Sequence, residues 1–192
     1  MKLVILDRDG TINADSDDFV KTPDEWHPLP GALEAIARLN HAGWHVVIAS
    51  NQSGLGRGLF DVASLNAIHA KMHKMLAAVG GRIDAVFYCP HSPEELCTCR
   101  KPLPGLVEQI GSRFGVPLSG VPTAGDSVRD LVAGARAGCE PHLVLTGKSA
   151  PFAAGGQPEG LPADTVLHQD LVAFVDFILA RSTGVPESNQ KQ

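Results

Sequence analysis

The stretch Leu3-Val4-Ile5-Leu6-Asp7-Arg8-Asp9-Gly10-Thr11-Ile12 decides the fold of this chain. Its first four residues form a short apolar run bounded by a glycine turn, the pattern of a strand buried on both faces. Asp7 and Asp9 follow at once, and two carboxylates so close in sequence would not both enter a core. At the carboxyl edge of a parallel sheet they can converge on one small space, where open α/β sheets bind ligands. The stretch therefore predicts an α/β fold with an acidic site after its first strand.

The two aspartates suit phosphoryl transfer. One carboxylate can attack phosphorus while the other moves protons, which is the division of labour in an aspartyl-phosphate mechanism. The alternative is a solvated acidic turn, and the complete strand-DxDGT unit argues against it.

The composition indicates a cytoplasmic enzyme. With 192 residues, 44% of them hydrophobic and 19% charged, the chain has the size and composition of one globular domain. A formal net charge of -5 disfavours nucleic-acid and membrane partners, which require a positive field. The first apolar run is too short for a secretory signal, and no segment approaches the roughly 18 apolar residues of a spanning helix. We expect a monomer with one domain over 1–181, no separate cap domain and a disordered tail over 182–192.

Short apolar runs alternate with helical patterns, which predicts a doubly wound parallel sheet. The expected strands are 3–6, 44–49, 85–88, 121–124, 142–145 and 165–167. The expected helices are 31–43, 61–78, 103–114, 127–137 and 171–179, with a Gly/Pro-rich loop over 147–162. His69 and His73 are four residues apart in the second helix, but no third ligand lies nearby, so no metal site is expected there.

Three more polar residues each lie in a loop on the same edge as the aspartates. Ser50 and the main-chain N–H groups of Asn51 and Gln52 can hold phosphoryl oxygens. The alternative is an ordinary turn, in which a Ser-Asn pair is also common. Lys101 can neutralise charge on a transferring phosphoryl group, or be a solvated loop lysine. Asp126 can complete a Mg²⁺ site with Asp7, or cap the helix that follows it.

The order of these residues resembles the haloacid dehalogenase-like phosphohydrolase superfamily, from Leu3 to about Leu145. The resemblance implies a three-layer α/β core and Mg²⁺-dependent transfer through an aspartyl-phosphate. It implies that Asp7 is the nucleophile and that Asp9 is first the general acid and then the base. It further implies that Ser50 and Lys101 orient the phosphoryl group. Mg²⁺ would be held by Asp126, the Asp7 carboxylate and the Asp9 main-chain carbonyl.

A second cluster predicts zinc. Cys89, His91, Cys97 and Cys99 give the pattern C-x-H-x5-C-x-C, which suits a closed tetrahedral Cys3His site. Unliganded buried thiols or a redox role are the alternatives. A structural zinc here would hold in place the loop that carries Arg100 and Lys101. The fourth cysteine, Cys139, is expected to be a packing residue.

The zinc-binding loop, together with Asn51-Gln52-Ser53-Gly54 and Arg57-Gly58, resembles one branch of the superfamily. That branch contains the D-glycero-D-manno-heptose-1,7-bisphosphate 7-phosphatases and the histidinol-phosphatases, and the Asn-Gln-Ser-Gly loop is more similar to the heptose enzymes. The resemblance implies removal of the 7-phosphate during synthesis of lipopolysaccharide heptose precursors. The second phosphate needs a cation, for which Arg100 is a better candidate than Arg57.

The acidic loop over 15–18 departs from the pattern of the branch, and we expect it to bind sugar hydroxyls or to be a solvated flap. Histidinol phosphate is the alternative substrate, and a nucleic-acid 3′-phosphatase is disfavoured by the net charge. A non-enzymatic zinc- and phosphate-binding protein is the alternative from another class. The expected substrate contacts are Asp15, Ser16, Asp17, Asp18, Asn51, Gln52, Ser53, Arg57, Arg100 and Lys101.

Overall fold

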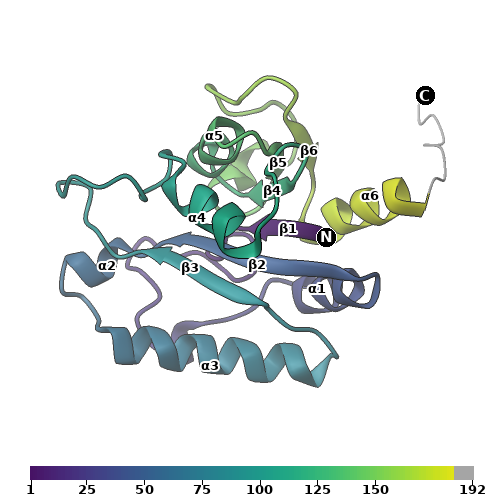
Figure 1. Cartoon of the computed structure of the whole chain (residues 1–192). Coiled ribbons are helices and arrows are strands. Elements are labelled where there is room, and N and C mark those ends of the chain that lie inside the picture. Colours follow the sequence, from purple (N-terminus) through teal and green to yellow (C-terminus); the bar gives the residue numbers. More distant parts are fainter. Residues whose placement is uncertain (184–192) are drawn as a thin grey trace.

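The computed structural model describes residues 1–183, and at its centre is a six-stranded, fully parallel sheet with the order β3-β2-β1-β4-β5-β6 (Figure 1). Its strands are β1 (Lys2–Leu6), β2 (Trp44–Asn51), β3 (Ala85–Cys89), β4 (Pro122–Gly125), β5 (Glu140–Val144) and β6 (Val166–His168). The helices are α1 (Ala32–His41), α2 (Ser53–Gly56), α3 (Val62–Ala78), α4 (Gly105–Phe114), α5 (Val128–Arg136) and α6 (Leu171–Thr183). Two short 3-10 helices are η1 (Pro23–Glu25) and η2 (Gly147–Phe152).

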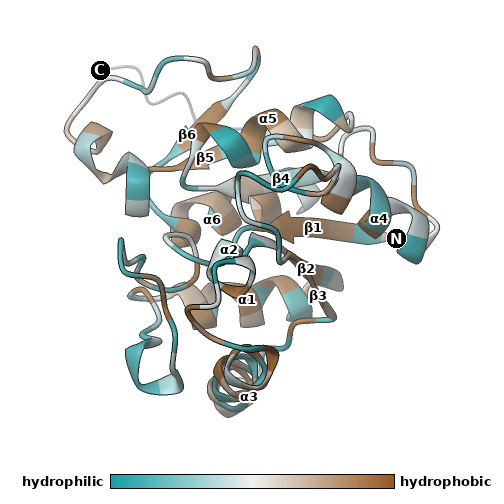
Figure 2. Ribbon diagram, turned by 90° about the vertical axis from the view of Figure 1, so that its left-hand side faces the viewer, coloured by the Kyte–Doolittle hydropathy of each residue, from teal (hydrophilic) through white to brown (hydrophobic). Residues whose placement is uncertain are grey.

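Helices cover both faces of the sheet, so the predicted doubly wound, three-layer architecture is confirmed. Val4 and Leu6 of β1 pack in the core cluster that includes residues of α1, α3 and α6. Leu3 and Ile5 point to the opposite face and pack against α4. This alternation explains why β1 is a continuous apolar run, since a strand buried on both faces has no solvated side. Figure 2 shows the resulting apolar centre, with β1 coloured as hydrophobic.

The chain order reverses at β1, which lies between β2 and β4. Parallel sheets bind ligands at such a switch point, outside the carboxyl ends of the strands. The main chain just beyond β1 is still held there, because the N–H of Asp7 donates to the carbonyl of Ala124 at 2.8 Å. Residues that follow β1, β2 and β4 therefore meet at one edge.

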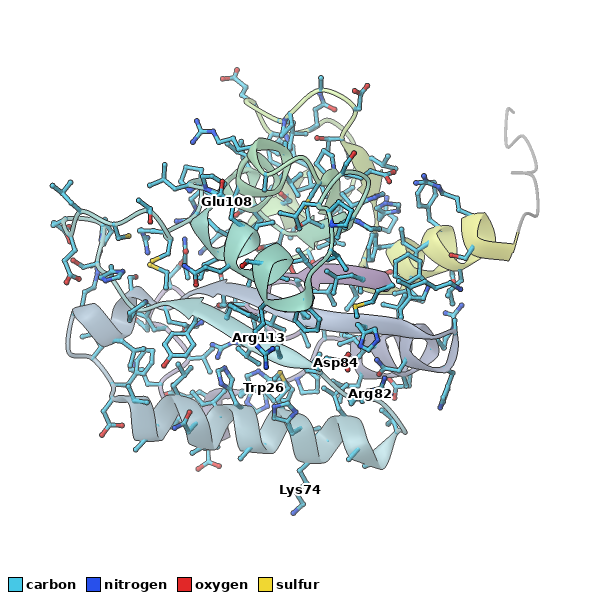
Figure 3. The ribbon with its side chains drawn as sticks, viewed as in Figure 1. Trp26, Lys74, Arg82, Asp84, Glu108 and Arg113 are labelled. Carbon is cyan, nitrogen blue, oxygen red and sulfur yellow. The ribbon has the colours of Figure 1, made fainter. Side chains whose placement is uncertain are left out.

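The long segment over 13–30, which we call the flap, is attached to the domain beneath the sheet. Trp26 of the flap is fully buried in the core cluster beside α3. On α3 itself, Lys74 points away from the protein (Figure 3). The ammonium of Lys71 on α3 donates to the carbonyls of Pro23 and Trp26, at 2.6 and 2.8 Å. Because its later part is held in this way, the flap has a defined course past the edge of the sheet.

The structure differs from the sequence expectations at the loops and at one helix end. The loop after β2 contains the short helix α2, and the start of the expected loop over 147–162 is the 3-10 helix η2. The last helix, expected to end at 179, continues to Thr183, and in this extension Arg181 pairs with Glu140 and the Ser182 hydroxyl donates to the carbonyl of Ile178. The rest of the predicted tail lies outside the described residues. Within residues 1–183, no helix is long and apolar enough to cross a membrane.

Candidate active site

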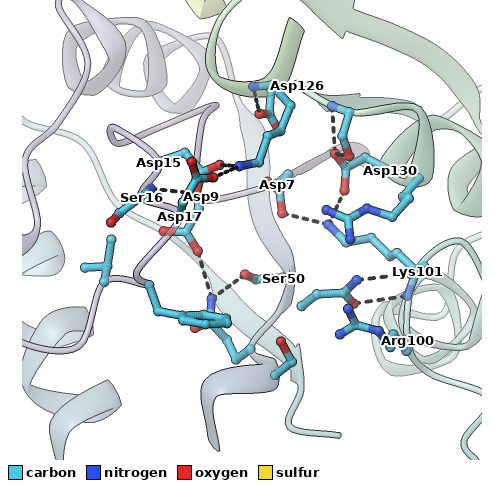
Figure 4. Close-up of a pocket in the computed structure, with 18 of the residues that line it drawn as sticks. Asp7, Asp9, Asp15, Ser16, Asp17, Ser50, Arg100, Lys101, Asp126 and Asp130 are labelled. Carbon is cyan, nitrogen blue, oxygen red and sulfur yellow. Dashed lines mark hydrogen bonds and ion pairs between the residues drawn. The ribbon is translucent and has the colours of Figure 1, made fainter. Parts of the chain in front are cut away.

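The carboxyl end of β1 carries a buried ion-pair network. Lys101, which is 3% exposed, donates to Oδ1 of Asp7 at 2.6 Å and to the carbonyl of Ala49 at 2.7 Å. Its ammonium also lies 2.6 Å from Oδ1 of Asp130 (Figure 4). Burial alone would lower the pKa of Lys101, but the two carboxylates outweigh it and raise that pKa. Lys101 is therefore a permanent cation. It binds Oδ1 of Asp7 and not Oδ2.

Asp9 is held by a set of hydrogen-bond donors. Arg8 donates through Nη2 to both carboxylate oxygens at 2.9 Å, and Asn13 and Gln52 each add one bond of 2.9 Å. Burial tends to raise the pKa of Asp9, but these donors stabilise the carboxylate and hold the pKa below its ordinary value. Asp9 is therefore ionised and fixed in orientation.

Asp126 follows β4 and faces Asp7, as the sequence predicts. One oxygen each of Asp7, Asp126 and Asp130 lies within 4.8 Å of the other two. Burial, with repulsion between the carboxylates, raises the pKa of Asp7 to about 7 and that of Asp126 to about 8. Three carboxylate oxygens gathered in one small space have the composition that a hard divalent cation binds.

Two glycines make room for this carboxylate cluster. Gly10 and Gly147 both have positive φ, of 81° and 48°, and a Cβ atom on either would overlap the carboxylate of Asp126. The glycine in the DxDGT unit is therefore required by the close approach as well as by the turn. Asp126 is not the helix cap that we considered as an alternative, because Ser127 occupies the N-cap of α5 and forms a capping box with Asp130.

The loop after β2 differs in one respect from the prediction. The main-chain N–H of Gln52 donates to the carbonyl of Cys89 at 2.8 Å, so it is not free for a phosphoryl oxygen. Its side-chain amide instead donates to Ser50 Oγ at 2.7 Å and to Asp9. The side chain of Asn51 binds the main chain of Lys101 on both sides, at 3.0 and 3.1 Å. Asn51 and Gln52 thus position Lys101, Ser50 and Asp9.

These groups line a pocket of about 360 Å³, a size suited to a small molecule. Of the expected substrate contacts only Asp18 does not line it. At the entrance, Lys148 lies 2.9 Å from Asp15 and 2.7 Å from Asp17, and its main-chain N–H donates to Asp126 at 2.6 Å. The acidic flap is thus tied across the pocket to η2.

Three arginines line the same pocket: Arg57, Arg100 and Arg129. Within the described residues none of them forms an ion pair with a carboxylate. Burial, together with the positive charges of Arg129 and Arg57, lowers the pKa of Arg100. Mutually repelling guanidinium groups that face one pocket provide a binding region for an anion.

The cysteine cluster lies beside the pocket. Ligand atoms of Cys89, His91, Cys97 and Cys99 are all within 4.8 Å of one another. The Sγ atom of Cys89 lies 3.8 Å from that of Cys97 and 3.1 Å from that of Cys99, and His91 Nδ1 is 3.4 Å from Cys89 Sγ. Two sulfur ligands of a tetrahedral zinc are separated by about 3.8 Å, given Zn–S bonds of about 2.3 Å. The cluster therefore has the ligand types and the close spacing of a metal site.

Sequence reasoning missed four residues that contribute to this site. Asp130 had a readable signal, since Ser127-x-x-Asp130 before a helix is a capping box. Arg8 was visible only as the variable residue of DxD, and Arg129 and Lys148 lie in segments without a motif. The residues missed are Arg8, Arg129, Asp130 and Lys148.

Two family models match the chain. The model described as polynucleotide kinase 3 phosphatase matches residues 2–119, and the model described as HAD-hydrolase-like matches residues 98–169. Together they span the pocket residues from β1 to the loop after β5.

Full-length relatives and solved structures agree with these matches. A Bordetella bronchiseptica protein named D-glycero-beta-D-manno-heptose-1,7-bisphosphate 7-phosphatase is 59% identical, over 93% of this chain and 98% of its own length. A Pseudomonas aeruginosa protein of the same name is 49% identical, over 92% of this chain and 97% of its own. The crystal structure of the B. bronchiseptica heptose bisphosphate phosphatase with magnesium and phosphate has a TM-score of 0.87 and 58% identity, and covers 94% of this chain and 99% of that chain.

Proposed function

Because this chain belongs to the D-glycero-beta-D-manno-heptose-1,7-bisphosphate 7-phosphatase family of HAD-like phosphatases, we propose that it removes the 7-phosphate from that heptose bisphosphate. The chain is a phosphoric monoester hydrolase, as its relatives are. We further propose that it acts as a cytoplasmic monomer of one domain and supplies lipopolysaccharide heptose precursors.

In the proposed reaction Asp7 attacks phosphorus through Oδ2. The bond from phosphorus to the sugar O7 breaks as the bond to Asp7 forms, and Asp9 gives its proton to the leaving oxygen. The arriving phosphate dianion favours the protonated form of Asp9, since like charges raise a carboxyl pKa. In the second step Asp9 takes a proton from a water molecule that attacks the aspartyl-phosphate. Inorganic phosphate leaves and Asp7 is restored.

Lys101 and Ser50 orient the phosphoryl group in this proposal. The ammonium of Lys101 is already fixed by Asp7 and Ala49, so no reorganisation is needed as charge develops. Ser50 is 1% exposed, and its hydroxyl proton is free to bind a phosphoryl oxygen because Oγ accepts from Gln52.

We propose that Mg²⁺ is held by the carboxylates of Asp7 and Asp126 and the main-chain carbonyl of Asp9. The raised pKa values of Asp7 and Asp126 support this, because a dication relieves the repulsion between them. When bound, Mg²⁺ supplies positive charge that offsets the repulsion between an anionic nucleophile and a phosphate dianion. Asp130 belongs to the same acidic cluster but is engaged by Lys101 and by the cap of α5.

We propose that the cysteine cluster holds a structural zinc. With Cys89, His91, Cys97 and Cys99 as ligands, no coordination position is left open, so the metal would hold the loop rather than take part in the reaction. Arg100 and Lys101 directly follow Cys99. Nη1 of Arg100 lies 3.5 Å from the main-chain carbonyl oxygen of His91. A metal at this point would fix the backbone that presents both cations to the pocket.

The observation that carries the substrate proposal is the arginine group beside the carboxylate centre. One phosphate of the substrate would occupy the centre formed by Asp7 and Lys101. The other needs cations outside that centre, and Arg100, supported by Arg57 or Arg129, is placed to bind it. A monophosphate would leave these arginines without a partner.

The alternatives each have one feature in their favour. Histidinol phosphate has an amine that would suit the acidic flap, but Asp15 and Asp17 are already paired with Lys148. A polynucleotide 3′-phosphate is suggested by the name of one family model, but the net charge of -5 and the acidic entrance disfavour a nucleic acid.

The test is phosphate release with Mg²⁺ from both anomers of heptose 1,7-bisphosphate, from histidinol phosphate and from a 3′-phosphorylated oligonucleotide. We expect kcat/KM to favour one bisphosphate anomer by about a hundredfold or more, and Arg100→Ala to reduce activity only on the bisphosphate. Equal loss on the bisphosphate and histidinol phosphate would contradict the role of Arg100. Preference for another substrate would replace the heptose assignment.

A further inference from the structure

Arg8 is a buried cation whose contacts extend beyond Asp9. Its side chain is 0% exposed, and Nη1 lies 3.2 Å from Nε2 of His69 on α3. Helix α3 lies beneath the sheet, on the face covered by α1 (Figure 1). This contact connects the site at the sheet edge to a helix none of whose residues lines the pocket.

The direction of the hydrogen bond follows from the chemistry of the two groups. A guanidinium has only donors, so Nε2 of His69 must be the acceptor and its ring proton must lie on Nδ1. Burial, followed by the charge of Arg8, lowers the pKa of His69 to about 4. At neutral pH the ring is therefore uncharged, and Nε2 can accept the hydrogen bond from Arg8.

We propose that His69 is a positioning residue: it anchors Arg8 so that the guanidinium holds Asp9 in the orientation needed for proton transfer to the leaving oxygen. This inference rests on the proposed phosphatase function. Asn13 and Gln52 each contact one oxygen of Asp9, whereas Arg8 spans both. With Nη1 no longer bound, the guanidinium can turn and move the carboxylate, and proton transfer is sensitive to such misplacement.

The proposal makes a prediction that a merely structural role does not. An alkyl leaving group such as a sugar oxygen needs a proton from Asp9, whereas p-nitrophenolate is a stable anion and needs little help. The ratio kcat/KM reports only the steps up to formation of the aspartyl-phosphate, so it isolates the leaving-group step. Loss of the anchor should therefore reduce activity on the alkyl phosphate and largely spare the aryl phosphate.

The experiment compares His69→Leu, which cannot accept a hydrogen bond, with His69→Gln, whose side-chain carbonyl can. His73→Leu, at an exposed position one turn further along α3, is the matched control. We expect His69→Leu to lose about tenfold or more in kcat/KM on heptose bisphosphate and less than about threefold on p-nitrophenyl phosphate. His69→Gln should regain most of the loss, and His73→Leu should match the wild type.

Equal losses on both substrates, no loss, or a glutamine variant no better than leucine would each overturn the proposal. His69→Ala provides a second truncation if the leucine variant fails to fold, as judged by its circular dichroism and melting temperature. If the wild type hydrolyses p-nitrophenyl phosphate but not heptose bisphosphate, the substrate assignment is wrong. The same comparison is then made with histidinol phosphate, whose leaving group is also an alkyl oxygen, so the two failures remain distinguishable.

Discussion

Replacing Lys101 with methionine should reduce both stability and activity, for different reasons. Methionine has a similar length but leaves the carboxylates of Asp7 and Asp130, both within 2.6 Å of the ammonium, without their cation. Breaking a buried ion pair costs about 3 to 5 kcal/mol of unfolding free energy. Loss of one preorganised charge at the phosphoryl group costs about 10² to 10³ in kcat.

The loss of stability should depend on pH. Without Lys101 the repulsion between Asp7 and Asp130 is relieved when Asp7 binds a proton. The pKa of Asp7, about 7 in the presence of the lysine, rises further in the variant. The variant should therefore be closer to the wild type at pH 5 than at pH 8, when urea unfolding is measured without Mg²⁺.

A second substitution separates the two effects. In Lys101→Met with Asp130→Asn, one of the unpaired charges is gone while the cap of α5 keeps an acceptor, so stability should recover but kcat should not. Lys74→Met, at an exposed lysine of α3, is the control and should change neither quantity. A double variant with activity near that of the wild type would refute the role of Lys101 in phosphoryl transfer.

Three further predictions concern the nucleophile, the zinc and a buried histidine pair. Asp7→Asn should abolish turnover on every substrate while the melting temperature stays within a few degrees, and substantial activity would remove Asp7 as nucleophile. Cys97→Ser should lower zinc content, melting temperature and activity together, whereas Cys139→Ser should leave the zinc content unchanged; an equal zinc content in both would contradict the site. Burial lowers the pKa of His142 to about 3 and that of His168 to about 4, both below 6.5, so the unfolded state gains protons first as the pH falls. Unfolding free energy should therefore fall by up to about 3 kcal/mol between pH 6.5 and 5, and His168→Gln should weaken that dependence.

The sequence predicted the sheet and its helices because their signals are local. Apolar runs such as 3–6 and the helical spacing over 61–78 carry the periodicity of the element that they form. The helix η2 was missed because its Gly- and Pro-containing sequence is typical of a loop. It is fixed by contacts distant in sequence, such as the bond from Thr146 to the carbonyl of Gly10 at 2.6 Å.

Site residues could be predicted where they belong to a sequence motif. They could not be predicted where their role depends on a contact with a residue distant in the chain. Asp7 and Asp126 follow strands and could be placed at one edge from the sequence alone. Lys148 could not, because its role depends on a flap that begins far earlier in the chain. Arg8 could not either, since strand alternation would turn it away from Asp9, whereas the turn after β1 brings the two side chains together.

The charge balance at the centre explains why the site needs both a dication and an outer group of arginines. At this centre the carboxylates number two more than the cations that contact them, counting Asp7, Asp9, Asp126 and Asp130 against Arg8 and Lys101. A phosphate dianion entering that centre alone would be repelled, and one divalent cation offsets the excess. This leaves no positive charge in the centre for a second phosphate. Recognition of a bisphosphate must therefore come from cations outside the centre, and Arg57, Arg100 and Arg129 provide them.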